Sequence, residues 1–249
     1  MSVNMYGNLA DTISSARSLV AFSGAGMSTE SGLPDFRSSK GLWAQYDPMA
    51  LASVHAMENN PGAFLDFYRC RIKALKKAAP NRAHYVLADW EKRGLLKAVI
   101  TQNVDGLHQE AGSKAVAELH GSLRRARCRK CSHEGSSDLL LHEKSCPLCG
   151  GFLRPSVVLF GEALPEEPLN EAQKLTATSD VFIVLGSSLN VSPANLFPVE
   201  AVRHKATLII INQEPTLYDD VASFVVRENL VEVLVHLHRI IFGERGGAL

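Results

Sequence analysis

Short apolar runs alternate along the chain with segments of helical periodicity. The apolar runs are of strand length, and they predict buried strands at residues 18–22, 98–101, 116–119, 157–160, 181–185, 207–211 and 222–226. Between them, the spacing of apolar positions predicts helices at residues 82–93, 169–178, 194–204 and 230–241, with a turn and short helix at 102–110. Strands that are apolar throughout and separated by helices indicate an α/β fold with a doubly wound parallel sheet covered on both faces.

Two segments interrupt this alternation. Residues 38–80 contain helical patches and no convincing strand, and residues 123–153 are polar, basic and rich in cysteine. We interpret both as insertions that build a small second domain, one part helical and the other metal-binding. The large sheet domain is then predicted to consist of residues 1–37, 81–122 and 154–249.

Composition excludes several classes of protein. The 249 residues are 46% hydrophobic and 21% charged, which is ordinary for a globular protein. Lys+Arg and Asp+Glu are balanced at 26 each, whereas nucleic-acid binders usually have a basic excess. The N-terminus does not resemble a signal peptide, and no apolar run reaches the ~20 residues of a membrane helix. We therefore expect a soluble, cytoplasmic protein with no membrane partner, for which nucleic acid is an unlikely ligand.

Four of the five cysteines form two C-x2-C pairs, namely Cys128 with Cys131 and Cys146 with Cys149. Two such pairs can complete a tetrahedral zinc site, and a shell of four thiolates leaves no position for water, which indicates a structural zinc. The alternative is a redox dithiol. His133 and His142 lie between the pairs, and we interpret both as surface residues. The fifth cysteine, Cys70, is predicted to be a buried small hydrophobic residue.

A glycine-rich turn, Gly24-Ala25-Gly26, follows the first predicted strand. Glycines there allow backbone N–H groups to approach a pyrophosphate, although a tight strand-to-helix turn would need them too. Thr29 stands at the third glycine position of the dinucleotide fingerprint, which argues against an ordinary hydride-transfer dehydrogenase. Because parallel strands end at one edge of the sheet, we expect one rim to carry Gly24, Gln102, His120, Gly186 and Asn212.

Eight segments, taken in order, closely resemble the sirtuin family of NAD-dependent protein deacylases. They are residues 24–28, 34–37, 101–105, 119–121, the four paired cysteines, 158–162, 186–189 and 211–212. The resemblance runs from about residue 15 to residue 235, and the chain looks like a bare catalytic core of bacterial type. It implies a Rossmann-like NAD domain, a small domain of helices plus zinc ribbon, and a cleft between them. It also implies that nicotinamide leaves NAD, that the acyl group of an acyl-lysine passes to ADP-ribose, and that free lysine is released.

The resemblance also assigns residues. His120 and Asn103 are the implied catalytic residues. The implied NAD contacts are Gly24, Ala25, Gly26, Ser28, Thr29, Phe36, Arg37, Gln102, Asn103, Val104, Asp105, His120, Gly186, Ser187, Ser188, Asn212, Gln213, Leu230 and Val231. The implied substrate contacts are Tyr68, Arg71, Val158, Phe160, Gly161, Glu162, Leu189 and Asn190. The peptide would add as an extended strand between the two domains.

The residue types fit these roles, although each has a simpler explanation. An unperturbed imidazole titrates near pH ~6.5, which suits His120 as a general base, but such a histidine could also cap or pack. Asn103 and Asp105 would hold the ribose and nicotinamide regions, yet an Asn-x-Asp-Gly sequence also satisfies a turn. Phe36 would shield the reacting sugar, and it could equally be a core residue.

Tyr68 and Arg71 lie at i and i+3 of a helical segment and so share a face. Some sirtuins that remove succinyl or malonyl groups carry such a pair, in which the arginine makes a charge-assisted contact with the acyl carboxylate. The alternative is a solvated basic helix. Besides deacetylation, desuccinylation is therefore a hypothesis.

Three further alternatives remain open. An NAD glycohydrolase or ADP-ribosyltransferase would need the same NAD pocket but no peptide groove. A non-catalytic zinc-ribbon module would be expected to have basic and aromatic residues in its insertion. An ordinary dehydrogenase would be expected to have the third glycine. We expect acyl-lysine proteins or peptides as partners and a monomeric state.

Overall fold

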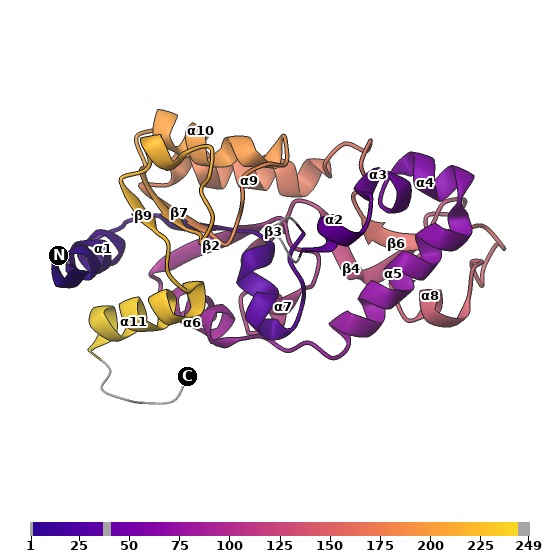
Figure 1. The fold of residues 1–249 in the computed structure, drawn as a ribbon, viewed down its shortest axis with the longest axis horizontal. Helices are drawn as coiled ribbons and strands as arrows, with labels where there is room; N and C mark the ends of the chain where they lie inside the picture. The colour runs from indigo at the N-terminus through magenta and orange to yellow at the C-terminus, as the bar shows by residue number, and fades with distance from the viewer. Residues whose placement is uncertain (1, 37–40, 244–249) are drawn as a thin grey trace.

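The computed structural model describes residues 2–36 and 41–243. Its larger part is a parallel sheet of six strands in the order β3-β2-β1-β7-β8-β9 (Figure 1). The strands are β1 Leu19–Ser23, β2 Leu96–Thr101, β3 Val116–Glu118, β7 Val181–Leu185, β8 Thr207–Ile211 and β9 Phe224–Val226. Every neighbouring pair is parallel, which confirms the predicted doubly wound sheet.

Helices cover both faces of this sheet. α1 Ser2–Ser14, α6 Arg82–Lys92 and α11 Leu230–Phe242 pack on one face, and α9 Glu166–Thr178 and α10 Phe197–Arg203 pack on the other (Figure 1). β1 shows why both faces are apolar: Leu19 and Ala21 join the first core, while Val20 and Phe22 join the second. All five residues of β1 are buried, as the uninterrupted apolar pattern predicts.

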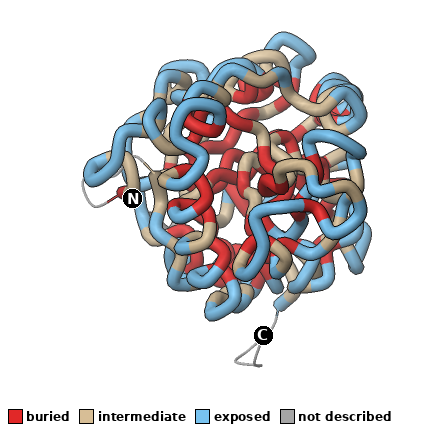
Figure 2. Tube along the Cα trace, turned by 90° about the vertical axis from the view of Figure 1, so that its right-hand side faces the viewer, coloured by how far each residue is buried: buried red, intermediate tan, exposed pale blue. Residues whose placement is uncertain are grey.

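The smaller part combines helices with a three-stranded antiparallel sheet in the order β5-β4-β6. Its elements are α2 Leu42–Gln45, α3 Pro48–Leu51, α4 Val54–Asn59, α5 Pro61–Leu75, β4 Gly121–Cys128, β5 Glu134–Ser136, α8 Leu139–His142 and β6 Leu153–Val157. A third core joins α5 to β4 and β6 through buried side chains that include Phe64, Ile72, Ala126 and Leu153. Figure 2 shows these buried segments inside a layer of exposed ones.

Short turns and helices connect these elements. They are η1 Ala25–Ser31, α7 Leu107–Glu110, η2 Ala194–Leu196 and η3 Asp219–Val221. The division into domains stays a prediction, and two of its predicted boundaries, at residues 122/123 and 153/154, lie inside β4 and β6. Among the described residues, no helix has both the length and the apolar character needed to cross a membrane.

The strand predicted at residues 157–160 is wrong, because β6 ends at Val157 and pairs antiparallel with β4. The apolar residues after it form a loop that packs between other parts of the small domain. Leu159 is buried in the third core, and Phe160 makes backbone hydrogen bonds with residues 52 and 54. A segment can therefore be apolar because of such packing without being a strand.

Three other expectations need correction. Cys70 is exposed, because it lies on the outer side of α5. The helix predicted at 194–204 consists of the 3-10 turn η2 followed by α10. The segment 123–153, for which we predicted no strand, contains most of β4, in which Leu123, Ala126 and Cys128 are buried and the arginines are exposed.

Candidate active site

A cavity of about 660 Å³ follows the carboxyl edge of the parallel sheet. It is lined by the turns that follow β1, β2, β7 and β8, and by the loop that leads into α11. The five residues expected on one rim all line it, namely Gly24, Gln102, His120, Gly186 and Asn212. The prediction that strand ends gather these residues is confirmed.

Two glycine turns meet at the floor of this cavity. Gly24 N donates to Leu185 O at 3.0 Å, and Gly26 N donates to Gly186 O at 2.8 Å. A Cβ atom on Gly26 would lie 2.8 Å from Gly186 Cα, and Gly186 itself has φ +60°. Only residues without a side chain allow the turns after β1 and β7 to approach so closely.

Asn103 and Asp105 connect the turn after β2 with the turn after β1. Asn103 Nδ2 donates to Gly24 O at 2.9 Å, and Ser28 Oγ donates to Asp105 Oδ2 at 2.8 Å. Leu107 N also donates to Asp105 Oδ1 at 2.9 Å, so the turn chemistry considered as an alternative is present as well. Burial raises the pKa of the Asp105 carboxyl, although the hydrogen bonds from Leu107 and Ser28 oppose that shift.

His120 is half-buried and lines the cavity directly after β3. Its Nδ1 lies 3.0 Å from the Gln102 carbonyl oxygen, which can only accept a hydrogen bond. In the neutral imidazole this contact places the proton on Nδ1 and leaves the lone pair on Nε2, as a general base requires. Gln102 Nε2 donates to Ser187 Oγ at 2.8 Å, so the same segment also contacts the turn after β7.

Behind these residues lies a buried polar column that the sequence did not reveal. Ser23 Oγ lies 2.7 Å from Thr101 Oγ1 and 2.9 Å from His108 Nε2, and the His108 ring centroid is 5.0 Å from that of His84. Asn103 N donates to Thr101 Oγ1 at 3.0 Å, so the column reaches the site. Burial lowers the pKa of His84 to about 4 and that of His108 to about 3. Both rings are therefore neutral at physiological pH.

The far end of the cavity is aromatic and carries the half-buried guanidinium of Arg71. Tyr68 is buried, and Arg71 Cζ lies 5.6 Å from its ring centroid and 5.1 Å from that of Phe36. Burial lowers the pKa of Arg71, and Tyr68 and Asp105 oppose that shift. The arrangement brings together the pair that the helical spacing put on one face, at a wall shared with Val158 and Phe160.

Most of the other predicted contacts also line the cavity. They are Ala25, Gly26, Thr29, Asn103, Val104, Ser187, Ser188, Asn190, Gly161, Glu162, Gln213, Leu230 and Val231. Ser28 and Asp105 line a neighbouring, mostly apolar cavity of about 590 Å³ that shares Phe36 and Arg71 with the first. Leu189 is fully buried in the second core of the sheet, and Arg37 lies outside the described residues.

Further residues line the cavity without having been predicted, among them Trp43, Val191, Ser192, Glu214 and Glu228. Glu228 lies just before the N-cap of α11, and Ser192 lies just before Pro193, the N-cap of η2. The residues that precede predicted helices at this edge of the sheet were therefore candidates that the sequence offered. Trp43 offers no such sequence pattern, because its place depends on how α2 packs against Phe36 and Phe67.

The four paired cysteines come together in the smaller part of the structure. Their sulfur atoms all lie within 4.8 Å of one another, with Cys128 and Cys149 at 3.5 Å and Cys131 and Cys146 at 3.7 Å. Sulfur atoms around a tetrahedral zinc are about 3.8 Å apart, whereas a disulfide needs about 2.0 Å. The arrangement therefore fits a metal ion, consistent with zinc, held by four thiolates and no histidine.

Comparisons with known proteins identify the family of the chain. The model of the Sir2 family matches residues 24–193. NAD-dependent protein deacetylase 1 of Geobacillus kaustophilus is 50% identical over 228 residues, which cover 91% of this chain and 94% of that protein. The NAD-dependent protein deacylase of Aeropyrum pernix is 48% identical over 233 residues, covering 91% of this chain and 94% of that protein.

Two solved structures are also similar. One is a Sir2 homolog in complex with NAD, with 39% identity, a TM-score of 0.89, and coverage of 94% of this chain and 93% of that one. The other is a Sir2 enzyme with a p53 peptide and NAD+, with 36% identity, a TM-score of 0.85, and coverage of 94% and 97%. The family model and these relatives show that the chain belongs to the Sir2, or sirtuin, family.

Proposed function

We propose that this protein is an NAD-dependent protein-lysine deacylase that transfers the acyl group to ADP-ribose and releases nicotinamide and free lysine. The observation that carries the proposal is His120, whose Nδ1 contacts the Gln102 carbonyl inside a cavity that offers both a dinucleotide floor and an acyl wall. Relatives named NAD-dependent protein deacetylase or deacylase cover about nine-tenths of the chain and support it.

The residues divide the work along the cavity. NAD, when bound, supplies the ribose carbon that loses nicotinamide and receives the acyl oxygen. The glycine turns and the Ser187 and Ser188 segment hold the dinucleotide, and Asn212 holds the adenosine half. Asn103 and Asp105 keep the turn after β2 in place, and His120 Nε2 accepts a proton from a ribose hydroxyl.

The acyl side of the cavity indicates a preference. Arg71 presents a guanidinium among Phe36, Phe67 and Tyr68, in a wall that otherwise offers mainly aromatic and aliphatic surface. An acidic acyl group, succinyl or malonyl, would give this cation a charge-assisted partner. We therefore extend the proposal from deacetylation to removal of acidic acyl groups.

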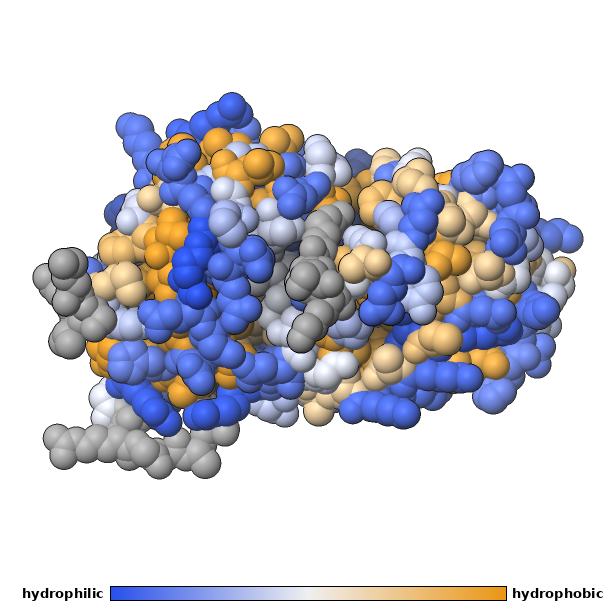
Figure 3. Space-filling view, viewed as in Figure 1, coloured by the Kyte–Doolittle hydropathy of each residue, from blue (hydrophilic) through white to orange (hydrophobic). Residues whose placement is uncertain are grey.

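Zinc has a structural role in this proposal. Four thiolates fill a tetrahedral shell, so no coordination position is left for water or substrate. The chain acts as a cytoplasmic monomer on acyl-lysine proteins, not on nucleic acid. Figure 3 shows hydrophilic side chains over much of one face, with groups of hydrophobic ones between them.

The decisive experiment incubates the purified protein with NAD and an acetyl-lysine peptide, and analyses the products by mass spectrometry. Loss of the acetyl group, matched by O-acetyl-ADP-ribose and nicotinamide and abolished in His120→Ala, is expected. Nicotinamide release while both acetyl-lysine and succinyl-lysine peptides stay intact would replace the deacylase with a glycohydrolase or transferase.

A further inference from the structure

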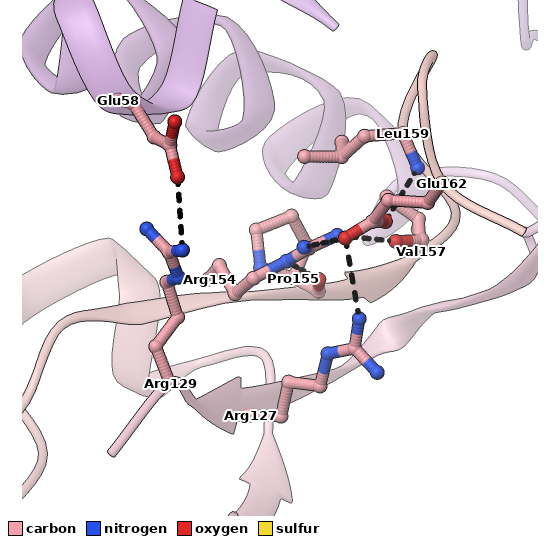
Figure 4. Close-up of polar contacts among 8 residues, drawn as sticks. All are labelled: Glu58, Arg127, Arg129, Arg154, Pro155, Val157, Leu159 and Glu162. Atoms are coloured by element: carbon pink, nitrogen blue, oxygen red, sulfur yellow. Dashed lines mark hydrogen bonds and ion pairs between the residues drawn. The ribbon is translucent and has the colours of Figure 1, made fainter. Parts of the chain in front are cut away.

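An ion pair between buried Arg154 and half-buried Glu162 lies at the wall of the cavity, to which Glu162 contributes. Arg154 of β6 is only 3% exposed, and its Nη1 and Nη2 lie 2.5 and 2.9 Å from the two carboxylate oxygens of Glu162 (Figure 4). The same guanidinium donates to Val157 O at 2.6 Å and to Pro155 O at 3.2 Å. A planar bidentate contact of this kind fixes direction as well as distance.

Both oxygens of the Glu162 carboxylate accept hydrogen bonds from the chain itself. Leu159 N donates to its Oε2 at 2.8 Å, and Arg127 Nη2 lies 3.7 Å from its Oε1 (Figure 4). Burial raises the pKa of Glu162, but Arg154, the Leu159 N–H and Arg127 outweigh that effect and the net pKa is lowered. With its oxygens occupied in this way, Glu162 is poorly placed to bind a peptide directly.

Residues 158–162, which end at Glu162, form one wall of the cavity. It is held at three places. Val158 N donates to His120 O at 2.9 Å, and Phe160 exchanges backbone hydrogen bonds with Ala52 and Val54 at 3.0 and 3.1 Å. The third anchor is the Arg154–Glu162 pair, which fixes the turn from Leu159 to Glu162.

The same pair connects that segment with the cysteine cluster. Arg154 stands opposite Arg127 in the β4–β6 ladder, and the next register pair is Leu153 with Cys128. Through Arg154, the loop at residues 158–162 is therefore bonded to the small antiparallel sheet, in which β4 ends at the metal-binding Cys128. A rigid support of this kind is what a substrate groove requires.

We propose that Arg154 and Glu162 are positioning residues that hold residues 158–162 in the conformation that binds the acyl-lysine peptide. The proposal rests on the deacylase function proposed above. Glu162 acts through the loop and not on the substrate. The pair therefore sets the affinity for peptide, while NAD binding and the chemical step, which depend on the turns of the parallel sheet, stay nearly unchanged.

The test measures acetyl-lysine peptide binding by calorimetry and steady-state kinetics with both substrates varied. Its variants are Glu162→Gln, Arg154→Gln and the double variant. We expect each single variant to raise the Kd and KM for peptide at least tenfold, with the KM for NAD within twofold and kcat within threefold. The double variant should lose less peptide affinity than the two single variants added together, because both substitutions remove the same Arg154–Glu162 contact.

The matched control is Arg129→Gln. It breaks the exposed pair between Arg129 Nη2 and Glu58 Oε1, 3.0 Å apart in the same domain, and should leave every constant unchanged (Figure 4). If Arg154→Gln fails to fold, Glu162→Gln and Glu162→Asp carry the test, with melting temperature and zinc content as folding checks.

The possible outcomes distinguish failure of the positioning role from failure of the deacylase function. A folded Glu162→Gln variant that binds peptide as the wild type does, or that loses NAD and peptide affinity equally, overturns the positioning role alone. Wild-type protein that neither binds nor deacylates an acyl-lysine peptide overturns the deacylase function, and the positioning role falls with it.

Discussion

Lowering the pH from 7 to 5 is expected to destabilise the protein through two buried histidines, His84 and His108. Burial lowers their pKa values to about 4 and about 3, from an ordinary 6.5. In the unfolded chain both would take up a proton as the pH falls through 6.5, whereas in the fold neither does so until the pH nears 4. Their contribution is therefore complete above pH 6.5 and is lost as the pH falls towards 4.

The magnitude follows from these shifts. At pH 5, which is about 1.5 units below the ordinary pKa, a histidine in the unfolded chain is almost fully protonated. Protonation then stabilises the unfolded state by about 2 kcal/mol for each histidine. The two together lower the free energy of unfolding by about 4 kcal/mol, a large share of the ~5–15 kcal/mol of a typical domain. Within the part of the chain that the structure describes, His84 Nε2 and His108 Nδ1 have no hydrogen-bond partner, so none of its carboxylates contacts these atoms to stabilise a charge.

The assay is urea unfolding at pH 7, 6 and 5, followed by the fluorescence of buried Trp90. In His108→Gln the free energy of unfolding should fall by about 2 kcal/mol less between pH 7 and 5 than it does in wild type. The comparison isolates the histidine because the carboxylates titrate equally in both proteins. His204→Gln, at an exposed histidine, is the control and should keep the wild-type slope. An unchanged pH dependence in His108→Gln would refute the reasoning.

Four other substitutions and one treatment test the site. His120→Ala should lower kcat/KM by about 10²–10⁴ with an unchanged melting temperature, and equal turnover would remove it as the base. Arg71→Met should lower kcat/KM for a succinyl-lysine peptide about 10- to 150-fold, which corresponds to about 1.5–3 kcal/mol, and leave acetyl-lysine turnover nearly unaffected. A succinyl peptide cleaved as fast as before contradicts the acyl proposal. A zinc chelator should lower the melting temperature of wild type, while Cys131→Ser, already lacking one ligand, should contain less zinc before treatment. Gly186→Ala places a Cβ 2.6 Å from the Gly26 carbonyl carbon at a left-handed φ, so it should cost about 1–3 kcal/mol of stability, measured by urea unfolding.

Periodicity predicted those parts of the fold whose environment is uniform. β1, β7 and β8 are buried or nearly so along their length, and an apolar run reports that directly. β4 was missed because only part of it faces the core and its other positions are arginines. The run at 157–160 misled because its apolar residues pack between helices and loops, which no local pattern distinguishes from a sheet.

The site was predictable where strand ends or family motifs marked it. Gly24, Gln102 and Gly186 follow buried strands, and the topology of a parallel sheet brings them together. The contact between Ser23 and His108 joins residues 85 positions apart, and Arg154 meets Glu162 only because β6 ends and turns there. Such pairings depend on the packed structure and leave no pattern in the sequence.

The walls of the main cavity come from segments spread over most of the chain, from residue 24 to residue 231. A dinucleotide bound there would touch many of them at once and act as a removable cross-link between distant parts of the polypeptide. At a concentration a hundred times its Kd, such a ligand adds about 2.7 kcal/mol to the free energy of unfolding. The resistance of this protein to proteolysis should therefore follow the NAD supply of the cell, so that its abundance, and not only its turnover, reports metabolic state.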